Sequence, residues 1–231
     1  MASQNVAISL KGKWIRVPCL AVNGRNIVSH GRFIRTASVH DEGWLEHPVD
    51  DPQPYVEALQ NERTGKRNKA ECLSWLIHLV GDIHQPLHCS SLFGGPFRGK
   101  EGDRGGNSFW IRMREDSARP IKLHTLWDGL PGTGKDLDRL AKKAEELVGA
   151  HPRRDFPSHT FGTAPVEWSK ESRRLSLEKA YQPLPSLDGT QAHPVVVPPD
   201  YFKNSKALAE ERVTLAGYRL ADQIHAQLAA R

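Results

Sequence analysis

A histidine and an aspartate interrupt an otherwise apolar helix, and this feature places the strongest constraint on how the chain can fold. Residues 68–84 read as a buried helix, because apolar side chains recur at helical spacing. These apolar positions are Leu73, Leu76, Ile77, Leu79, Val80 and Ile83. His78 and Asp82 are four residues apart on this helix, so their side chains share one face. A carboxylate among apolar neighbours is costly to bury unless it is paired or bound to a metal.

A second pair, His124 and Asp128, repeats this spacing, and His88 lies between the two pairs. Pro86 ends or kinks the first helix, so His88 is free to turn back towards either pair. Imidazole nitrogen and carboxylate oxygen are zinc ligands, and a hydrolytic zinc site uses three of them and leaves one position for water. We therefore expect a three-ligand site and part of a neighbouring one. The first would comprise His88, His124 and Asp128, and the second His78 and Asp82.

Simpler explanations exist for each of these residues. With eleven histidines in the chain, a lone His-x-x-x-Asp pair is most often a hydrogen bond on a helix surface. Two such pairs around a third histidine are harder to explain in this way. His84 lies off the face that His78 and Asp82 share. We expect its ring N–H to donate to a carbonyl or carboxylate, and we do not expect it to bind the metal directly. Trp75 and Trp127 fit the core better than a platform for base stacking.

The glycine-rich segment 102–107 is a second candidate site. Its glycines would let backbone N–H groups approach a phosphate, and Asn107 could bond a base edge. A glycine-rich turn alone is weak evidence, since most such turns are only turns. The sequence has neither a Gly-x-Ser-x-Gly elbow nor a phosphate-binding loop of the Walker type.

The rest of the chain indicates one mainly α domain with minor short strands. Helices are expected over 54–62, 136–148, 165–181 and 206–230, and residues 121–128 should start extended and become helical. A strand is expected at 109–112, and loops at 93–107 and 182–200, which are rich in glycine and proline respectively. Residues 1–50 are poorly periodic and read as irregular, with short β-like runs such as 14–17.

Composition sets only loose limits on function. A net charge of +5 over 231 residues is compatible with nucleic acid but does not establish it. No apolar run is long enough for a membrane span, so none is expected. The first residues lack a basic start and a cleavage site, so no signal peptide is predicted. Nothing in the sequence indicates an obligate protein partner.

Consecutive residues around both pairs are more specific than the spacing. Residues 75–88, Trp-Leu-Ile-His-Leu-Val-Gly-Asp-Ile-His-Gln-Pro-Leu-His, resemble the signature of the zinc-dependent single-strand nucleases, the S-one/P-one or type I nucleases and 3′-nucleotidases. Residues 102–107 with Phe109 and Trp110 resemble the family's Asp-x-Gly-Gly-Asn stretch. Residues 123–128 resemble its late His-x-x-x-Asp motif, and residues 216–221 its final helix. The resemblance covers roughly residues 52–231.

This resemblance implies a helical fold of the phospholipase C/P-one nuclease type and up to three zinc ions. It implies that His88, His124 and Asp128 hold one zinc, that His78 and Asp82 belong to another, and that Asp82 bridges to the third. The nucleophile would be a zinc-activated water, with no catalytic side chain beyond it. Asp103 and Asn107 would lie near the substrate. The substrates would be single-stranded DNA or RNA and 3′-nucleotides, cut to 5′-phosphorylated products.

The N-terminal segment departs from the family pattern. Family members begin with a tryptophan that binds zinc through its amine and carbonyl, followed by further histidine and aspartate ligands. Here His30 is the plausible counterpart of one such histidine, and one complete three-ligand site is expected. We therefore divide the chain into a divergent or incomplete segment, 1–50, and a zinc-dependent nuclease domain, 51–231. The family also implies a secreted or periplasmic protein.

Two other functions remain open at this point. An inactive or truncated family member would only bind metal or nucleic acid, because ligands near the N-terminus are missing. A zinc phospholipase-type phosphodiesterase is the third possibility, and the loop containing Asp103 and Asn107 favours the nuclease over it.

Overall fold

The computed structural model of this chain describes residues 5–10, 13–18, 20–22, 25–28, 66–98, 101–116, 119–162 and 164–229, with side chains described between 73 and 226. His30 and the helix expected over 54–62 lie outside the described residues.

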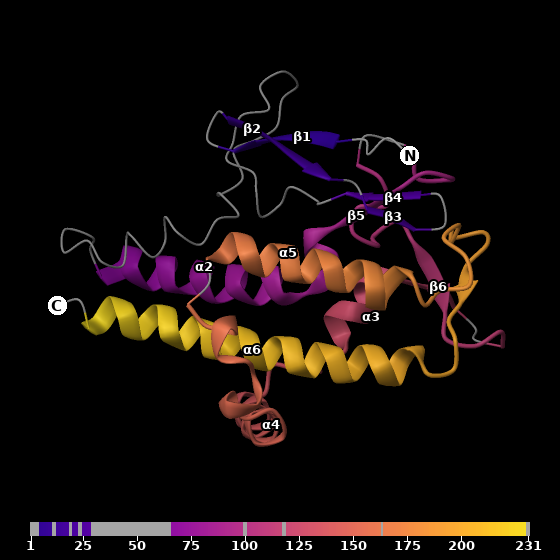
Figure 1. The fold of residues 1–231 in the computed structure, drawn as a ribbon. Coiled ribbons are helices and arrows are strands. Elements are labelled where there is room, and N and C mark those ends of the chain that lie inside the picture. Colours follow the sequence, from indigo (N-terminus) through magenta and orange to yellow (C-terminus); the bar gives the residue numbers. More distant parts are fainter. Residues whose placement is uncertain are drawn as a thin grey trace.

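The fold is mainly α, as the sequence predicts. The helices are α2 (Lys66–His84), α3 (Leu123–Gly129), α4 (Leu137–Ala150), α5 (Pro165–Leu175) and α6 (Tyr201–Ala229). Helix α2 packs against both α5 and α6, and these three long helices run side by side across the molecule (Figure 1). Each expected helix in this part of the chain is confirmed, although α6 begins five residues earlier than expected.

The inner face of α2 forms one of two apolar clusters, because its buried residues recur at helical spacing. Trp168 of α5 and Ala216 of α6 close this cluster from two sides. Its buried members are Leu76, Val80, Ile83, Cys89, Trp168 and Ala216. The opposite face of α2 carries His78 and Asp82, so the core itself orients this pair outwards.

The described strands are short: β1 (Asn5–Leu10), β2 (Lys13–Pro18), β3 (Leu20–Val22), β4 (Arg25–Val28), β5 (Ser91–Phe93), β6 (Trp110–Arg112), β7 (Ile121–Lys122) and β8 (Val195–Val196). Strands β3, β4, β5 and β6 lie to the right in Figure 1, and the β1–β2 hairpin lies at the top. They pair as β1-β2, β3-β4-β5 and β7-β6-β8, and only β6 and β8 run parallel. Strand β8 corrects the expectation of a loop over 182–200, since Val195 pairs with Ile111 of β6.

The second apolar cluster joins residues of β5, β6 and β8 to residues of α3, α6 and the π-helix η4 (Ser176–Tyr181). Its largest side chains include Phe109, Trp127 and Tyr181, each with almost no exposed surface. Trp127 donates its indole N–H to the Tyr201 hydroxyl at 3.1 Å, which satisfies a buried donor. The expectation that Trp127 is a core residue is therefore confirmed.

Helix α5 continues into a wider turn, the π-helix η4 (Ser176–Tyr181). Here the Gln182 N–H donates to the carbonyl of Leu177, five residues back, at 2.9 Å. Such a turn holds one residue more than the α-helix it interrupts. Ala180 and Tyr181 consequently point into the second cluster.

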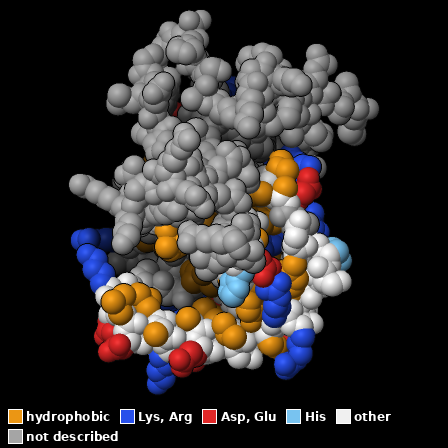
Figure 2. Space-filling model, turned by 90° about the vertical axis from the view of Figure 1, so that its left-hand side faces the viewer, with side chains coloured by type: hydrophobic (Ala, Val, Ile, Leu, Met, Phe, Trp, Pro, Cys, Tyr) orange, Lys and Arg blue, Asp and Glu red, His pale blue; other side chains and the backbone are white. Residues whose placement is uncertain are grey.

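Helix α4 projects from the body of the molecule and contacts α6 (Figure 1). Its N-cap is Asp136, whose carboxylate accepts from the N–H groups of Asp138 and Arg139 at 3.1 Å. Its apolar residues Leu137 and Leu140 are 78% and 42% exposed. Figure 2 shows hydrophobic side chains on the surface in the lower region where α4 lies, between charged ones. Among the described helices, none is long and apolar enough to cross a membrane.

Candidate metal centre

Three of the predicted ligands come together. His88, His124 and Asp128 each present one ligand atom, and these atoms all lie within 4.8 Å of one another. His88 is on the 3₁₀ turn η1 (Pro86–Cys89), and the other two are one turn apart on α3. Two imidazoles and a carboxylate match the donor set of a hydrolytic zinc site.

His88 also joins this trio to the first pair. Its Nε2 lies 3.4 Å from Oδ1 of Asp128, and its Nδ1 lies 3.3 Å from Oδ2 of Asp82. The same Asp82 oxygen lies 3.4 Å from Nε2 of His78. The two His-x-x-x-Asp pairs therefore meet at one imidazole. These five residues, His78, Asp82, His88, His124 and Asp128, are called the metal centre.

The charge state of His88 follows from this position. Burial lowers the pKa of its imidazole, but hydrogen bonds and charge attraction from Asp128 and Asp82 outweigh burial and raise the pKa from 6.5 to about 9. Without a metal, His88 holds a proton at neutral pH and donates to both carboxylates. A cation bound there would have to displace that proton.

His124 is oriented by the glycine-rich loop. Its ring Nδ1 lies 2.7 Å from the carbonyl oxygen of Gly105, and its backbone N–H donates to the carbonyl of Gly106 at 3.2 Å. Because a carbonyl oxygen only accepts, Nδ1 must carry the hydrogen. Nε2 then carries the lone pair that a metal ligand requires, and it lies 3.3 Å from Oδ2 of Asp128.

Asp103 holds this loop from inside. Its carboxylate accepts from the backbone N–H groups of Leu92 and Gly106 at 2.8 and 3.0 Å and from the Tyr181 hydroxyl at 2.6 Å. Burial raises the pKa of Asp103, although these hydrogen bonds oppose the rise. The side chain has no exposed surface, which argues against the direct contact with substrate that the sequence suggested.

Asn107 lies at the partly exposed end of the same loop. Its side-chain amide donates to the carbonyl of Arg104 at 3.1 Å, so its amide oxygen faces away from that contact. A role for Asn107 in substrate binding stays a prediction.

Gly105 shows why the loop needs glycine. Its φ is +63°, and a Cβ there would overlap the carbonyl oxygen of Leu87. Leu87 directly precedes His88, so the loop packs against the backbone next to one ligand while it hydrogen-bonds another. The loop is thus a spacer between His88 and His124.

Sequence reasoning missed Gln85, which supports the carboxylate of the trio. The Gln85 amide donates to Oδ1 of Asp128 at 2.9 Å, while its oxygen accepts from the N–H of Leu87. Burial raises the pKa of Asp128, but hydrogen bonds from His88 and Gln85 lower it overall, so the carboxylate stays ionised. The signal in the sequence is the position of Gln85, directly before Pro86, where a side chain caps the next turn.

Sequence reasoning also missed Arg212 and Arg219, two buried arginines of α6 that contact His84 at the end of α2. His84 donates its Nδ1–H to the carbonyl of Val80 at 2.7 Å, and its Nε2 accepts from Arg219 at 2.9 Å. Burial and the charge of Arg212 lower the pKa of His84 well below 6.5, so it is neutral. The expected hydrogen bond to a carbonyl is present, but it lies in the core. The signal was a pair of arginines seven residues apart on the apolar face of α6.

Comparison with known proteins points in one direction. The family model for S1/P1 nuclease matches residues 49–229. Endonuclease 4 of Arabidopsis thaliana is 28% identical over 166 residues, which cover 67% of this chain and 49% of that protein. Endonuclease 1 of the same plant is 25% identical over 192 residues, covering 78% of this chain and 56% of that protein. The chain spans about half the length of the curated relatives it matches.

Proposed function

Because the chain belongs to the S1/P1 nuclease family, we propose that it is a zinc-dependent endonuclease. It would hydrolyse phosphodiester bonds of single-stranded DNA or RNA to 5′-phosphorylated products and would also act on 3′-nucleotides. The observation that carries this proposal is the convergence of His88, His124 and Asp128 within 4.8 Å.

The residues of the metal centre suit zinc in donor type and in orientation. The tautomer of His124 is fixed by Gly105, and Asp128 is kept ionised by His88 and Gln85. When bound, zinc lowers the pKa of a water molecule to near neutrality and stabilises charge that develops on phosphate oxygens. The exposure of Asp128, 49% for its side chain, supports access of a nucleic acid from solvent.

The chain's own groups would then handle protons and orientation. His88 would have to lose one proton for a metal to bind, and the neutral ring would then offer the lone pair of one nitrogen to the metal and keep a single N–H for one neighbouring carboxylate. Asn107 and the backbone of residues 104–107 flank His124 and would orient the substrate.

The number of zinc ions is also part of the proposal. The trio supplies one three-ligand site. His78 and Asp82 supply two ligands for a second ion, and Asp82 would bridge to a third. His30, outside the described residues, is the proposed additional ligand from the N-terminal segment. Export from the cell, to the periplasm or the medium, is proposed from the family alone.

The direct test is digestion of single-stranded DNA by chelator-treated protein before and after zinc is added. We expect cleavage only with zinc, with products that carry 5′-phosphates, as end-labelling will detect. Zinc binding without any cleavage would favour the alternative that this chain is an inactive family member, which only binds metal or nucleic acid. Cleavage of dispersed phospholipid but not of DNA would favour the phosphodiesterase of the phospholipase type.

A further inference from the structure

The end of α2 lies between two ligands of the metal centre, Asp82 and His88. The last carbonyl groups of a helix have no partner within it and must find one elsewhere. Here the Asp82 carbonyl accepts from the N–H of Gln85 at 3.0 Å, as the chain turns. The next two carbonyls, those of Ile83 and His84, are bonded by side chains from other helices.

Ser172 of α5 and Arg212 of α6 supply these bonds, and the Cys89 thiol also donates to the Ile83 carbonyl at 3.5 Å. The Ser172 hydroxyl donates to the carbonyl of Ile83 at 2.6 Å, and Arg212 Nε donates to the carbonyl of His84 at 3.3 Å. Arg212 Nη2 also donates to the Ser172 hydroxyl at 3.0 Å, which leaves that hydroxyl its own hydrogen for Ile83. One arginine and one serine thus cap the helix from two neighbouring helices.

Arg219 and Glu171 fix Arg212 in place. Glu171 accepts from Arg219 through both oxygens at 2.8 Å and from Arg212 at 3.1 Å. Arg219 is only 1% exposed and also bonds the ring of His84 and the carbonyl of Thr160. The arginine cluster is defined as His84, Glu171, Ser172, Arg212 and Arg219.

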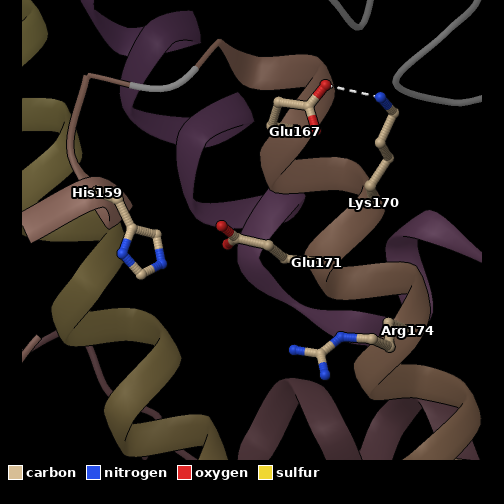
Figure 3. Close-up of a pocket in the computed structure, with 5 residues that line it drawn as sticks. All are labelled: His159, Glu167, Lys170, Glu171 and Arg174. Atoms are coloured by element: carbon tan, nitrogen blue, oxygen red, sulfur yellow. Dashed lines mark hydrogen bonds and ion pairs between the residues drawn. The ribbon is translucent and has the colours of Figure 1, made fainter. Parts of the chain in front are cut away.

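Glu171 is the member of this cluster that reaches the surface. It lines an open depression of about 330 Å³ (Figure 3). His159, Glu167, Lys170 and Arg174 line the same depression, and Lys170 is held by Glu167 at 2.6 Å. The carboxylate therefore faces solvent on one side and two buried guanidinium groups on the other.

We propose that Arg212 and Ser172 are positioning residues for the metal centre. By holding the carbonyls of Ile83 and His84, they fix the turn that sets the distance between Asp82 and His88. This inference rests on the proposed zinc site and adds two residues, about 90 and 130 positions from α2's end, that touch neither metal nor substrate. Loss of either cap lets the turn relax, so that His88 no longer faces both carboxylates.

The test measures zinc affinity of the full chain by competition with a chromophoric chelator, together with the absorption spectrum of the cobalt-loaded protein. Arg212→Lys keeps the positive charge beside Glu171 but loses the Nε donor. We expect zinc affinity to fall about tenfold or more, the usual cost of disturbing the supports of a metal ligand. We expect a changed cobalt spectrum as well. Ser172→Ala should change zinc affinity and the cobalt spectrum in the same direction, but by less than Arg212→Lys does.

Arg153→Lys is the matched control, because Arg153 forms a two-bond pair with Asp222 at the far end of α6. The Arg153–Asp222 pair is exposed, with side chains 45% and 41% accessible, so this variant should lose less stability than Arg212→Lys and should keep wild-type zinc affinity and spectrum. Wild-type affinity and spectrum in both Arg212→Lys and Ser172→Ala would overturn the proposal. If Arg212→Lys does not fold, the zinc affinity and cobalt spectrum of Ser172→Ala alone test the proposal.

Amide hydrogen exchange of metal-free protein separates this inference from the proposed function. The His88 N–H donates to the carbonyl of Gln85 at 3.1 Å within the turn. Faster exchange at His88 in Ser172→Ala than in Arg153→Lys supports positioning, and equal exchange contradicts it. A wild-type protein that binds no zinc would overturn the proposed function instead.

Discussion

The metal centre and the arginine cluster flank the same end of α2, yet they are built in opposite ways. In the arginine cluster most nitrogen–oxygen contacts of the guanidinium groups measure 2.8–3.1 Å, and both arginine side chains are nearly inaccessible. In the metal centre the imidazole–carboxylate contacts measure 3.3–3.4 Å, and Asp128 is half exposed. These contacts are longer and weaker than those of the arginine cluster, so a cation could replace the proton of His88 and use the same ligand atoms.

This contrast distinguishes side chains that stabilise the fold from side chains that can bind a cation. A cluster whose donors and acceptors satisfy one another has nothing left for a ligand. A cluster with open carboxylates and imidazole lone pairs keeps its capacity for a cation. We therefore expect mutations in the arginine cluster to reduce stability and to affect zinc affinity only through the turn after α2, whereas mutations in the metal centre should reduce metal binding and activity directly.

The largest effect is expected from Asp128→Asn. It removes the carboxylate that contacts both His88 and His124, so nuclease activity should be abolished. Zinc affinity should fall by more than about 100-fold, since loss of a mere support of a ligand already costs 10–100-fold. The assay is digestion of single-stranded DNA together with zinc titration. Asp116→Asn, at an exposed site, is the control, and unchanged activity in Asp128→Asn would refute the assignment.

Glu171→Ala should have the largest effect on stability. It leaves two buried arginines without their carboxylate, which we expect to cost about 3–4 kcal/mol, near the lower end for broken buried pairs because Glu171 keeps one side in solvent. Thermal and denaturant unfolding will measure it. If the variant unfolds like wild type, the arginine cluster does not hold the fold.

Gly105→Ala tests the spacer between His88 and His124. We expect a loss of about 2–3 kcal/mol from left-handed backbone strain and from the overlap with the Leu87 carbonyl. Zinc affinity should fall too, because His124 is hydrogen-bonded to this loop. Gly217→Ala, on α6 with open space around its Cα, is the control and should stabilise by about 0.5–1 kcal/mol.

The smallest effect is a pH dependence of the metal-free protein. The pKa of His88 in the folded chain is raised to about 9, so its protonated form stabilises the fold fully below pH 6.5. This contribution is lost as pH rises from 6.5 to 9. We expect about 1–2 kcal/mol, reduced by the exposure of Asp128. Melting curves of chelator-treated wild type and His88→Gln over this range will test it, and parallel curves would contradict it.

Much of the metal centre could be predicted from the sequence, because its information is local. The pairs His78–Asp82 and His124–Asp128 each lie within one helical turn, and Pro86 marks where the chain turns back. Helices α2, α3 and α4 follow from the apolar periodicity of their own residues. These signals need no knowledge of which segments meet in space.

What the sequence did not predict depends on long-range contacts. Asp103 was expected near substrate, but Tyr181, 78 residues away, holds its carboxylate in the core. Glu171 meets Arg212 and Arg219 across 41 and 48 residues. The partner of β8 is likewise far along the chain, so a segment with five prolines read as a loop. In each case a tertiary contact determines a side chain's surroundings, and the local pattern does not identify the partner.

The wide turn at Ser176–Tyr181 has a consequence for how this chain tolerates length changes. Deleting one amino acid there, for example Lys179, would restore regular α-helical winding without breaking the helix. The residues before and after the deletion would keep nearly the same register, because the wide turn fits one extra residue into the space of a regular turn. A one-residue deletion in α5 before this turn would instead rotate Tyr181 by about 100° away from Asp103, and the glycine loop would lose its anchor. The wide turn is therefore the place in this helix where a change of length least disturbs the loop that orients His124.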